Sequence, residues 1–269
     1  WINLAQIRMY ESTGNKDYFM KAKQMYDQWI WTTWGPEDEA PWYGGITWKT
    51  DVSKSKNACS NGPAAIIAAR IYNLYDKIGI TTVKSKEEYL NEAIKIYTWL
   101  RNNLFDSHTG AVYDNMNRKG NISKAVFTYN EGTFTGAAHE LYKITGDKQY
   151  LNEAVKACNY VIDYMSKNDG VLDNATSGDG GLFHGIFFRY FVKLINEPNL
   201  DYANRKKFHD YLTNCATVMA EQGVNPKTML YGGNWRKAPT DDEGVPLTPH
   251  LSGCMLMEAM CVLKPLPRK

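Results

Sequence analysis

The string KDYFMKA at residues 16–22 opens a helix, and the chain repeats this opening as EEYLNEA at 87–93 and KQYLNEA at 148–154. Each copy has a tyrosine in third place, a large apolar residue in fourth place and an alanine in seventh place. Successive tyrosines of the pattern are 71 and 61 residues apart. Repeats of this length fit a helical hairpin with a long loop better than one helix and its turn. The sequence therefore predicts an array of helix pairs whose loops carry the chemistry.

Two kinds of helix alternate along this array. The first kind is amphipathic with one polar face, and we expect it at about 17–30, 86–104, 147–166 and 203–222. The second kind is apolar nearly all round, and we expect it at about 1–12, 58–78, 129–145, 181–196 and 249–263. A helix that is apolar on every side is buried on every side, so the second kind forms an inner layer. This alternation predicts an all-α fold, an (α/α)6 toroid whose N-terminal part, about one and a half hairpins, is missing.

The size and charge of the chain limit the classes of protein to which it can belong. The chain has 269 residues and a mass of 30.6 kDa, so we expect a single domain over 1–269, incomplete at its N-terminus, and a monomer. Its 31 basic and 29 acidic residues nearly cancel and form no long block of one sign, so we expect no nucleic-acid partner. The apolar runs are too short and interrupted to span a bilayer.

The connections that lead into the inner helices are rich in aromatic and amide side chains. They lie at 42–51, 110–115, 170–174 and 231–235. In an alternating toroid these connections meet at one end, beside the N-termini of the inner helices, where unpaired N–H groups point outward. Flat aromatic rings pack on the C–H faces of sugars, and amides and carboxylates bind hydroxyl groups. This end is the predicted substrate site, and sugars are the predicted ligands.

The strongest group of candidate residues surrounds the start of the second inner helix. Trp48 and Asp51 follow a Gly-Gly pair, and Asn57 and Asn61 are spaced four apart on one helix face. Together they are typical of a wall that binds sugar hydroxyls. The alternative is structural: a glycine turn followed by a capping asparagine.

Two further inner helices and one further connection contain candidate residues. Tyr129 and Asn130 place polar groups at the entrance of an otherwise buried helix, which is costly unless they face a cavity. Asp179 and His184 open the next one, although Asp179 could equally cap a helix and His184 could be a satisfied core histidine. Trp235 belongs to the last of the long connections.

Several common chemistries have no signature in this chain. It contains no metal-ligand spacing, phosphate-binding glycine loop or nucleophile elbow, so we expect no metal and no organic cofactor. Its single Asp-Asp pair, Asp241-Asp242, lies between prolines, where a solvated loop is the expected structure.

Taken together, these strings resemble glycoside hydrolase family 76, the endo-α-1,6-mannanases. The resemblance extends over nearly the whole chain, and it is carried by GGITW at 44–48 with Asp51, Asn57 and Asn61, by YNEG at 129–132, by TGD at 145–147 and by FHGIF at 183–187. It implies an (α/α)6 barrel and retaining hydrolysis of the α-1,6-mannosidic bonds of mannan. Because that substrate is a polymer, it also implies an exported enzyme, located in the periplasm, at the cell surface or outside the cell.

The resemblance also predicts where the catalytic residues lie. The family's adjacent pair of aspartates precedes a Trp-Trp whose second member corresponds to Trp1, so we expect the pair just upstream of Trp1. A retaining glycosidase needs one carboxylate as nucleophile and another as acid and base, and binding groups replace neither. The chain as given is therefore expected to bind a glycan without supplying these carboxylates. The alternatives are a non-catalytic glycan-binding barrel, and a sugar epimerase or lyase with His184 or His250 as the proton carrier.

Overall fold

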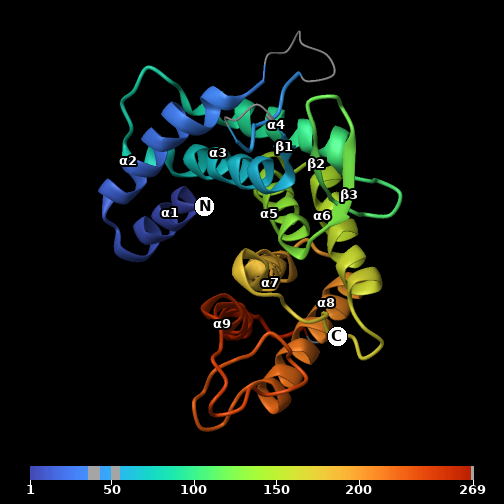
Figure 1. Ribbon diagram of the computed structural model, residues 1–269. Coiled ribbons are helices and arrows are strands. Elements are labelled where there is room, and N and C mark those ends of the chain that lie inside the picture. The colour runs from blue at the N-terminus through green and yellow to red at the C-terminus, as the bar shows by residue number, and fades with distance from the viewer. Residues whose placement is uncertain (36–42, 50–54, 268–269) are drawn as a thin grey trace. The chain divides into compact units, whose positions relative to one another are not determined.

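The computed structural model describes residues 1–35, 43–49 and 55–267, and within these residues the chain is predominantly helical (Figure 1). The inner helices are α1 (Ile2–Thr13), α3 (Ala58–Ile78), α5 (Thr128–Thr145), α7 (Phe183–Ile195) and α9 (Leu247–Val262). The outer helices are α2 (Lys16–Met25), α4 (Lys86–Leu104), α6 (Lys148–Tyr160) and α8 (Tyr202–Val218). The predicted all-α class and the order of helices are confirmed, with most boundaries within two residues.

Three outer helices end in a short π-helical turn, in which each N–H bonds the carbonyl five residues earlier. These turns are η1 (Tyr26–Ile30), η3 (Val161–Met165) and η5 (Met219–Gly223). Two 3₁₀ helices, η2 (Trp31–Thr33) and η4 (Gly178–Leu182), complete the helical elements of the described residues. After each outer helix a β-bridge closes the following connection, at Trp34↔Ile46, Phe105↔Val112, Ser166↔Leu172 and Val224↔Tyr231.

The structure contains a small antiparallel sheet that the sequence did not predict. It has the order β1 (Lys56–Asn57), β2 (Tyr113–Met116) and β3 (Ile122–Val126). The register pairs Asn57 with Asn115, and Asn115 with Ser123. The sequence predicted a connection at 110–115 but not that part of it forms a strand, because strands of two to five residues are too short for a period-of-two pattern to stand out.

The outer and inner helices differ in how their N-termini are capped. The outer helices begin with side-chain caps from Asn15, Ser85, Asp147 and Asp201, which accept hydrogen bonds from backbone N–H groups of the first turn. The cap residues of α3, α7 and α9 provide no such side-chain bond. The cap residues of these inner helices therefore do not satisfy the first N–H groups; in α7 the Gly185 N–H instead donates to Ser252 Oγ at 3.0 Å.

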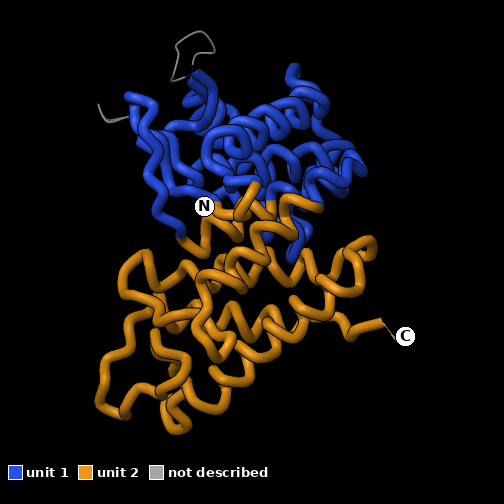
Figure 2. The backbone as a smooth tube through the Cα atoms, turned by 90° about the vertical axis from the view of Figure 1, so that its right-hand side faces the viewer, with its two compact units in different colours: residues 1–107, 112–126, 137–151 blue, residues 108–111, 127–136, 152–269 orange. Residues whose placement is uncertain are grey.

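The chain divides into two compact units (Figure 2), which we describe separately. Unit 1 comprises residues 1–107, 112–126 and 137–151, and unit 2 comprises residues 108–111, 127–136 and 152–269. In unit 1, α3 packs against α1 and α4. In unit 2, α7 packs against α8 and α9, and its aromatic residues Phe187, Phe188 and Phe191 form a buried core. Within the described part of the chain, no helix combines the length and apolar character needed to cross a membrane.

Candidate functional site

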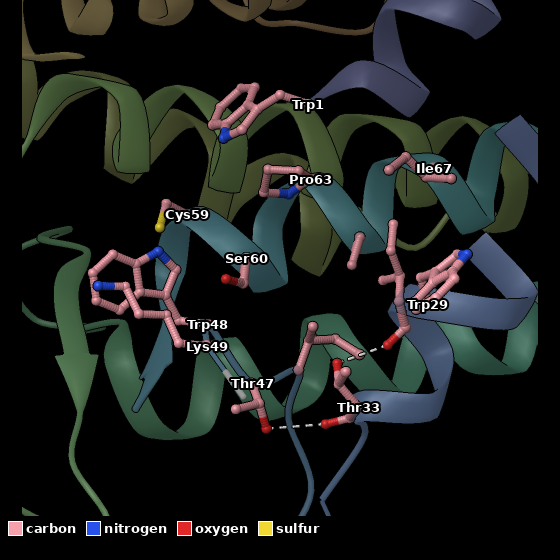
Figure 3. A pocket seen from close by; sticks show the side chains of 13 residues that line it. Trp1, Trp29, Thr33, Thr47, Trp48, Lys49, Cys59, Ser60, Pro63 and Ile67 are labelled. Atoms are coloured by element: carbon pink, nitrogen blue, oxygen red, sulfur yellow. Dashed lines mark hydrogen bonds between the residues drawn. The ribbon is translucent and has the colours of Figure 1, made fainter. Parts of the chain in front are cut away.

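Unit 1 contains a pocket of about 380 Å³ beside the first turns of α3 (Figure 3). Its lining residues are Trp1, Trp29, Ile30, Thr33, Ile46, Thr47, Trp48, Lys49, Cys59, Ser60, Pro63, Ala64 and Ile67. In Figure 3, Trp48 and Trp29 lie on opposite sides of the pocket, with Ser60 between them. The predicted candidate Trp48 thus belongs to a cavity with aromatic walls.

The loop that carries Trp48 is held by close packing. Gly44 and Gly45 both have positive φ angles, 67° and 75°, which favour glycine. A Cβ atom on Gly45 would lie 2.5 Å from the indole of Trp99, and the Trp99 Nε1–H donates to the Tyr43 carbonyl at 3.0 Å. The fully buried Lys56 donates from Nζ to the Gly44 carbonyl. The Gly-Gly pair is therefore a structural turn that fits against a tryptophan.

Asn61 anchors the same loop from α3. Its Oδ1 accepts from the Ile46 N–H at 2.7 Å, and its Nδ2 donates to the carbonyls of Ile46 at 3.0 Å and Asn57 at 2.9 Å. The side chain is fully buried. Both amide N–H groups are thus used on the backbone, so Asn61 holds the loop two residues before Trp48 and does not itself present an amide to a ligand.

The two other candidates near α3 differ in what can be said of them. Asn57 is buried, and its Oδ1 accepts a hydrogen bond of 2.8 Å from the Ser55 hydroxyl. Asp51 lies outside the described residues. Trp48 is the candidate of this group that lines the pocket, while Asn61 and Asn57 support the chain around it.

The pocket combines apolar faces with a few polar groups. Trp1, Trp29 and Trp48 are 48%, 70% and 47% exposed, so a large part of each residue is accessible to solvent. The Lys49 ammonium lies 3.9 Å from the centre of the Trp48 ring. Thr47 and Ser60 contribute hydroxyl groups to the lining. Exposed indoles beside hydroxyls and one cation are suited to an uncharged or anionic polyhydroxylated ligand.

Trp29 and the residues around it were not among the predicted site residues. Trp29 lies in the π-helical turn η1, at the end of a helix that we expected to be amphipathic and solvated. A signal was present, because Trp29, Trp31 and Trp34 are clustered within six residues. Nothing in a helical periodicity predicts a π turn, so the direction of Trp29 could not be read from spacing.

The remaining candidates lie in unit 2. Tyr129 stacks on Phe183 with ring centres 4.0 Å apart, which joins the starts of α5 and α7. Asn130 is fully buried in the first turn of α5. Asp179 lies in η4, directly before α7, as the sequence position suggested.

His184 is held by two hydrogen bonds. Its Nε2 lies 3.0 Å from the Asp173 carbonyl, which can only accept, so Nε2 carries the proton. Its Nδ1 lies 2.9 Å from the Thr128 hydroxyl and accepts from it. Burial lowers the pKa of His184 to about 4, although the Asp173 carbonyl favours the protonated form. His184 is therefore a neutral histidine with both ring nitrogens engaged.

Trp235 is also a packing residue. It is 2% exposed, its ring centre lies 5.5 Å from that of His184, and it contacts Phe188 at 5.8 Å. A buried indole cannot offer a free face to a sugar, so the expected stacking role is not available to Trp235 in this conformation. Within unit 2, the candidates His184 and Trp235 are brought together as neighbours.

The second histidine considered as a proton carrier is likewise engaged. His250 accepts from the Tyr231 N–H at 3.2 Å through Nδ1, and its Nε2 lies 3.6 Å from the Cys254 thiol. The His250 ring also stacks on Tyr231. With the ring nitrogens of His184 and His250 both bonded to the protein, the structure offers no support for an epimerase.

We expect His184 to make stability depend on pH. A folded-state pKa of about 4, below the ordinary 6.5, means that stability is fully present above pH 6.5 and is lost as the pH falls towards 4. The loss attributable to this residue is about 3 kcal/mol. Denaturant unfolding between pH 4 and 7 measures it, with His184→Gln as the control because glutamine can keep both bonds but does not titrate. Identical pH profiles for the two proteins would contradict this assignment.

The structure defines a protein of paired helices with an aromatic pocket, and comparison with known proteins identifies its family. Residues 1–267 match glycosyl hydrolase family 76. The chain belongs to this family, and the expected (α/α)6 class is confirmed with it. Among curated protein sequences, none is significantly similar to the chain.

Solved structures give the same result. The α-1,6-mannanase of family 76 from Salegentibacter sp. HEL1_6 is 37% identical, with a TM-score of 0.86 over 98% of this chain and 75% of that chain. An inactive variant of that mannanase, with two consecutive aspartates replaced by alanine, has been solved in complex with α-1,6-mannotetraose and has a TM-score of 0.87, 37% identity and coverage of 98% and 74%. A protein from Listeria innocua is 30% identical, with a TM-score of 0.82 over 96% of this chain and 69% of that chain.

Proposed function

We propose that the chain is the larger part of an α-1,6-mannanase and that the unit 1 pocket binds mannosyl residues. The observation that carries the proposal is the group of three partly exposed tryptophans around one cavity at the start of α3. The complex of the Salegentibacter mannanase with α-1,6-mannotetraose supports the choice of sugar. We propose mannan as the polymeric substrate. We also propose that the protein acts outside the cytoplasm, because such a polymer is not imported intact.

We further propose that the catalytic carboxylates are a pair of aspartates preceding Trp1. Two consecutive aspartates are replaced in the inactive Salegentibacter variant. The Asp241-Asp242 pair of this chain is a poor equivalent, because both side chains are exposed in a turn and Asp241 is paired with Lys227 at 2.8 Å. The position of Trp1 in the wall of the pocket supports a catalytic pair close to it.

Two structural properties complete the proposal. We regard units 1 and 2 as parts of a single glycosidase domain, because the helices α5 and α6 each continue from one unit into the other. Trp48 contacts the sugar, and Asn61 and Asn57 support the loop that carries it. The starts of α5 and α7 are shaped by five other candidates: Tyr129, Asn130, Asp179, His184 and Trp235.

The activity itself is tested with the full-length gene product and linear α-1,6-mannan. Release of short α-1,6-linked manno-oligosaccharides is the expected result. A polymer that is bound but left intact would instead identify a non-catalytic glycan-binding barrel, and neither binding nor cleavage would exclude mannan as the ligand.

Replacing Trp48 with alanine is expected to weaken binding of α-1,6-mannotetraose about tenfold to thirtyfold, because it removes an aromatic wall of the pocket. Isothermal titration calorimetry measures the change. The matched control is Tyr164→Ala, which removes a 69% exposed aromatic residue of unit 2 that does not line the pocket. If Trp48→Ala binds the tetrasaccharide as tightly as the unchanged protein, the sugar does not occupy this pocket.

A further inference from the structure

A partly buried ionic cluster in unit 1 includes one residue of the turn η1, which also supplies part of the pocket wall. Asp27 accepts hydrogen bonds from Lys23 at 2.9 Å, from Lys84 at 3.0 Å and from the Tyr89 hydroxyl at 2.8 Å. Lys84 also lies 2.7 Å from the Glu92 carboxylate. We call these five residues, Lys23, Asp27, Lys84, Tyr89 and Glu92, the Asp27 cluster.

Ion pairs and hydrogen bonds within the cluster offset the cost of burying its charges. Two ammonium groups face two carboxylates, and the Lys84 ammonium lies 4.2 Å from the centre of the Tyr89 ring. Burial alone would raise the pKa of Asp27, but hydrogen bonds from Lys23, Tyr89 and Lys84 outweigh it and hold the pKa below its usual range. Removing the charge of Asp27 would leave the buried Lys23 ammonium without its carboxylate partner, which is destabilising.

Asp27 belongs to the π turn that supplies one wall of the pocket. Asp27, Trp29 and Ile30 are all residues of η1, which closes with a bond from the Trp31 N–H to the Tyr26 carbonyl. Trp29 and Ile30 line the pocket. Asp27 is bonded instead to α4, through Tyr89, and to the connection before α4, through Lys84. One short turn therefore joins the ionic cluster to the pocket wall.

The same turn continues into the loop that carries Trp48. The Thr33 carbonyl, at the end of η2, accepts from the Thr47 N–H at 3.3 Å and from the Thr47 hydroxyl at 3.1 Å (Figure 3). Thr33 Oγ1 in turn donates to the Ile30 carbonyl at 2.8 Å. Trp29 is thus part of η1 itself, whereas the loop that carries Trp48 is bonded to η2 and is held independently by Asn61 and Lys56.

A second π turn provides an internal comparison. In η3, Asp163 is paired with Lys207 at 2.9 Å, but these side chains are 48% and 41% exposed. None of the residues of η3 lines the described pocket. The burial of the Asp27 cluster and its connection to the pocket therefore distinguish η1 from η3.

We propose that Asp27 is a positioning residue for sugar binding, which holds η1 so that Trp29 forms the wall of the pocket opposite Trp48. The proposal rests on the proposed function of that pocket. Asp27 does not line the pocket and acts on the ligand through Trp29.

A double-mutant cycle tests the proposal with α-1,6-mannotetraose as the probe. Asp27→Asn keeps the shape of the side chain but removes its charge, and we expect the Kd to rise about fivefold. Trp29→Ala is expected to raise the Kd about tenfold. If Asp27 acts through Trp29, the double variant binds no more weakly than Trp29→Ala. Calorimetry is done at a temperature at which circular dichroism shows every variant folded.

The controls separate positioning from general destabilisation. Asp163→Asn removes the matched ion pair of η3 and is expected to leave the Kd unchanged. If Asp27→Asn does not fold, Tyr89→Phe removes one hydrogen bond to Asp27 and replaces it in the same cycle. Full additivity of the Asp27 and Trp29 effects, or an unchanged Kd in the folded Asp27 or Tyr89 variant, would overturn the positioning role. Failure of the unchanged protein to bind mannotetraose would instead overturn the proposed function.

Discussion

Replacing Asn61 with leucine is expected to lower the free energy of unfolding by about 4 kcal/mol and to abolish measurable binding of α-1,6-mannotetraose. Leucine has nearly the same shape, so the change removes hydrogen bonds without opening a large cavity. It leaves the Ile46 N–H and the carbonyls of Ile46 and Asn57 without their present partner in a buried environment. Each buried backbone group that loses its partner costs about 1–3 kcal/mol.

Binding suffers because Asn61 fixes the loop that carries Trp48. Once the contacts to Ile46 are lost, the loop keeps its bonds to Lys56, Thr33 and Ser55 and the packing of Gly45 on Trp99, but it loses its anchor to α3. Urea unfolding and calorimetry measure the two effects. Asn214→Leu is the control, because Asn214 also donates to two backbone carbonyls, those of Asp169 and Gly170, but at a more exposed place in unit 2. A loss of stability no larger for Asn61→Leu than for Asn214→Leu would contradict the anchoring role.

Replacing Gly132 with alanine is expected to cost about 3 kcal/mol of stability, because it forces two inner helices apart. The added Cβ would lie 2.6 Å from the Phe187 Cα and 3.1 Å from both the Ile186 carbonyl oxygen and the Phe187 nitrogen. These are backbone atoms of α7, so no side chain can rotate away. The start of α5 would have to move away from α7, which also breaks the stacking of Tyr129 on Phe183.

Thermal and denaturant unfolding measure the Gly132→Ala effect. Gly244→Ala is the matched control, because a Cβ there meets no atom within 4 Å and the backbone angle is ordinary. We expect Gly244→Ala to change stability by less than about 0.5 kcal/mol. Equal stabilities of the two variants would mean that α5 and α7 do not approach as closely as the structure shows. The YNEG motif at 129–132 therefore contains a packing requirement as well as polar groups.

The helices were predictable because their causes are local. The apolar stripes, the capping side chains Asn15 and Ser85, and the glycine that ends α1 act within a few residues of one another. The short strands were not predictable, since β1 has two residues and is defined by its partner β2, more than fifty residues away.

The residues of the candidate site also differ in how far the sequence predicted them. A tryptophan after a glycine pair indicated Trp48 as a substrate-binding residue, which stays a prediction, and Trp48 lines the pocket. Asn61, His184 and Trp235 have the residue types of a sugar site, but their partners are backbone groups or buried rings. Trp29 had no helical signal at all, because a π turn directs its side chain.

By itself the sequence determined the alternation of helices, their boundaries and membership of the family, because periodicity, capping and motif strings are properties of neighbouring residues. The tertiary structure alone decided which polar and aromatic side chains serve the protein's own backbone and which remain open to a ligand. The physical reason is that a hydrogen-bonding group acts on whatever lies beside it in space. Asn61 meets Ile46 across 15 residues and His184 meets Thr128 across 56, distances in sequence over which no local pattern carries information.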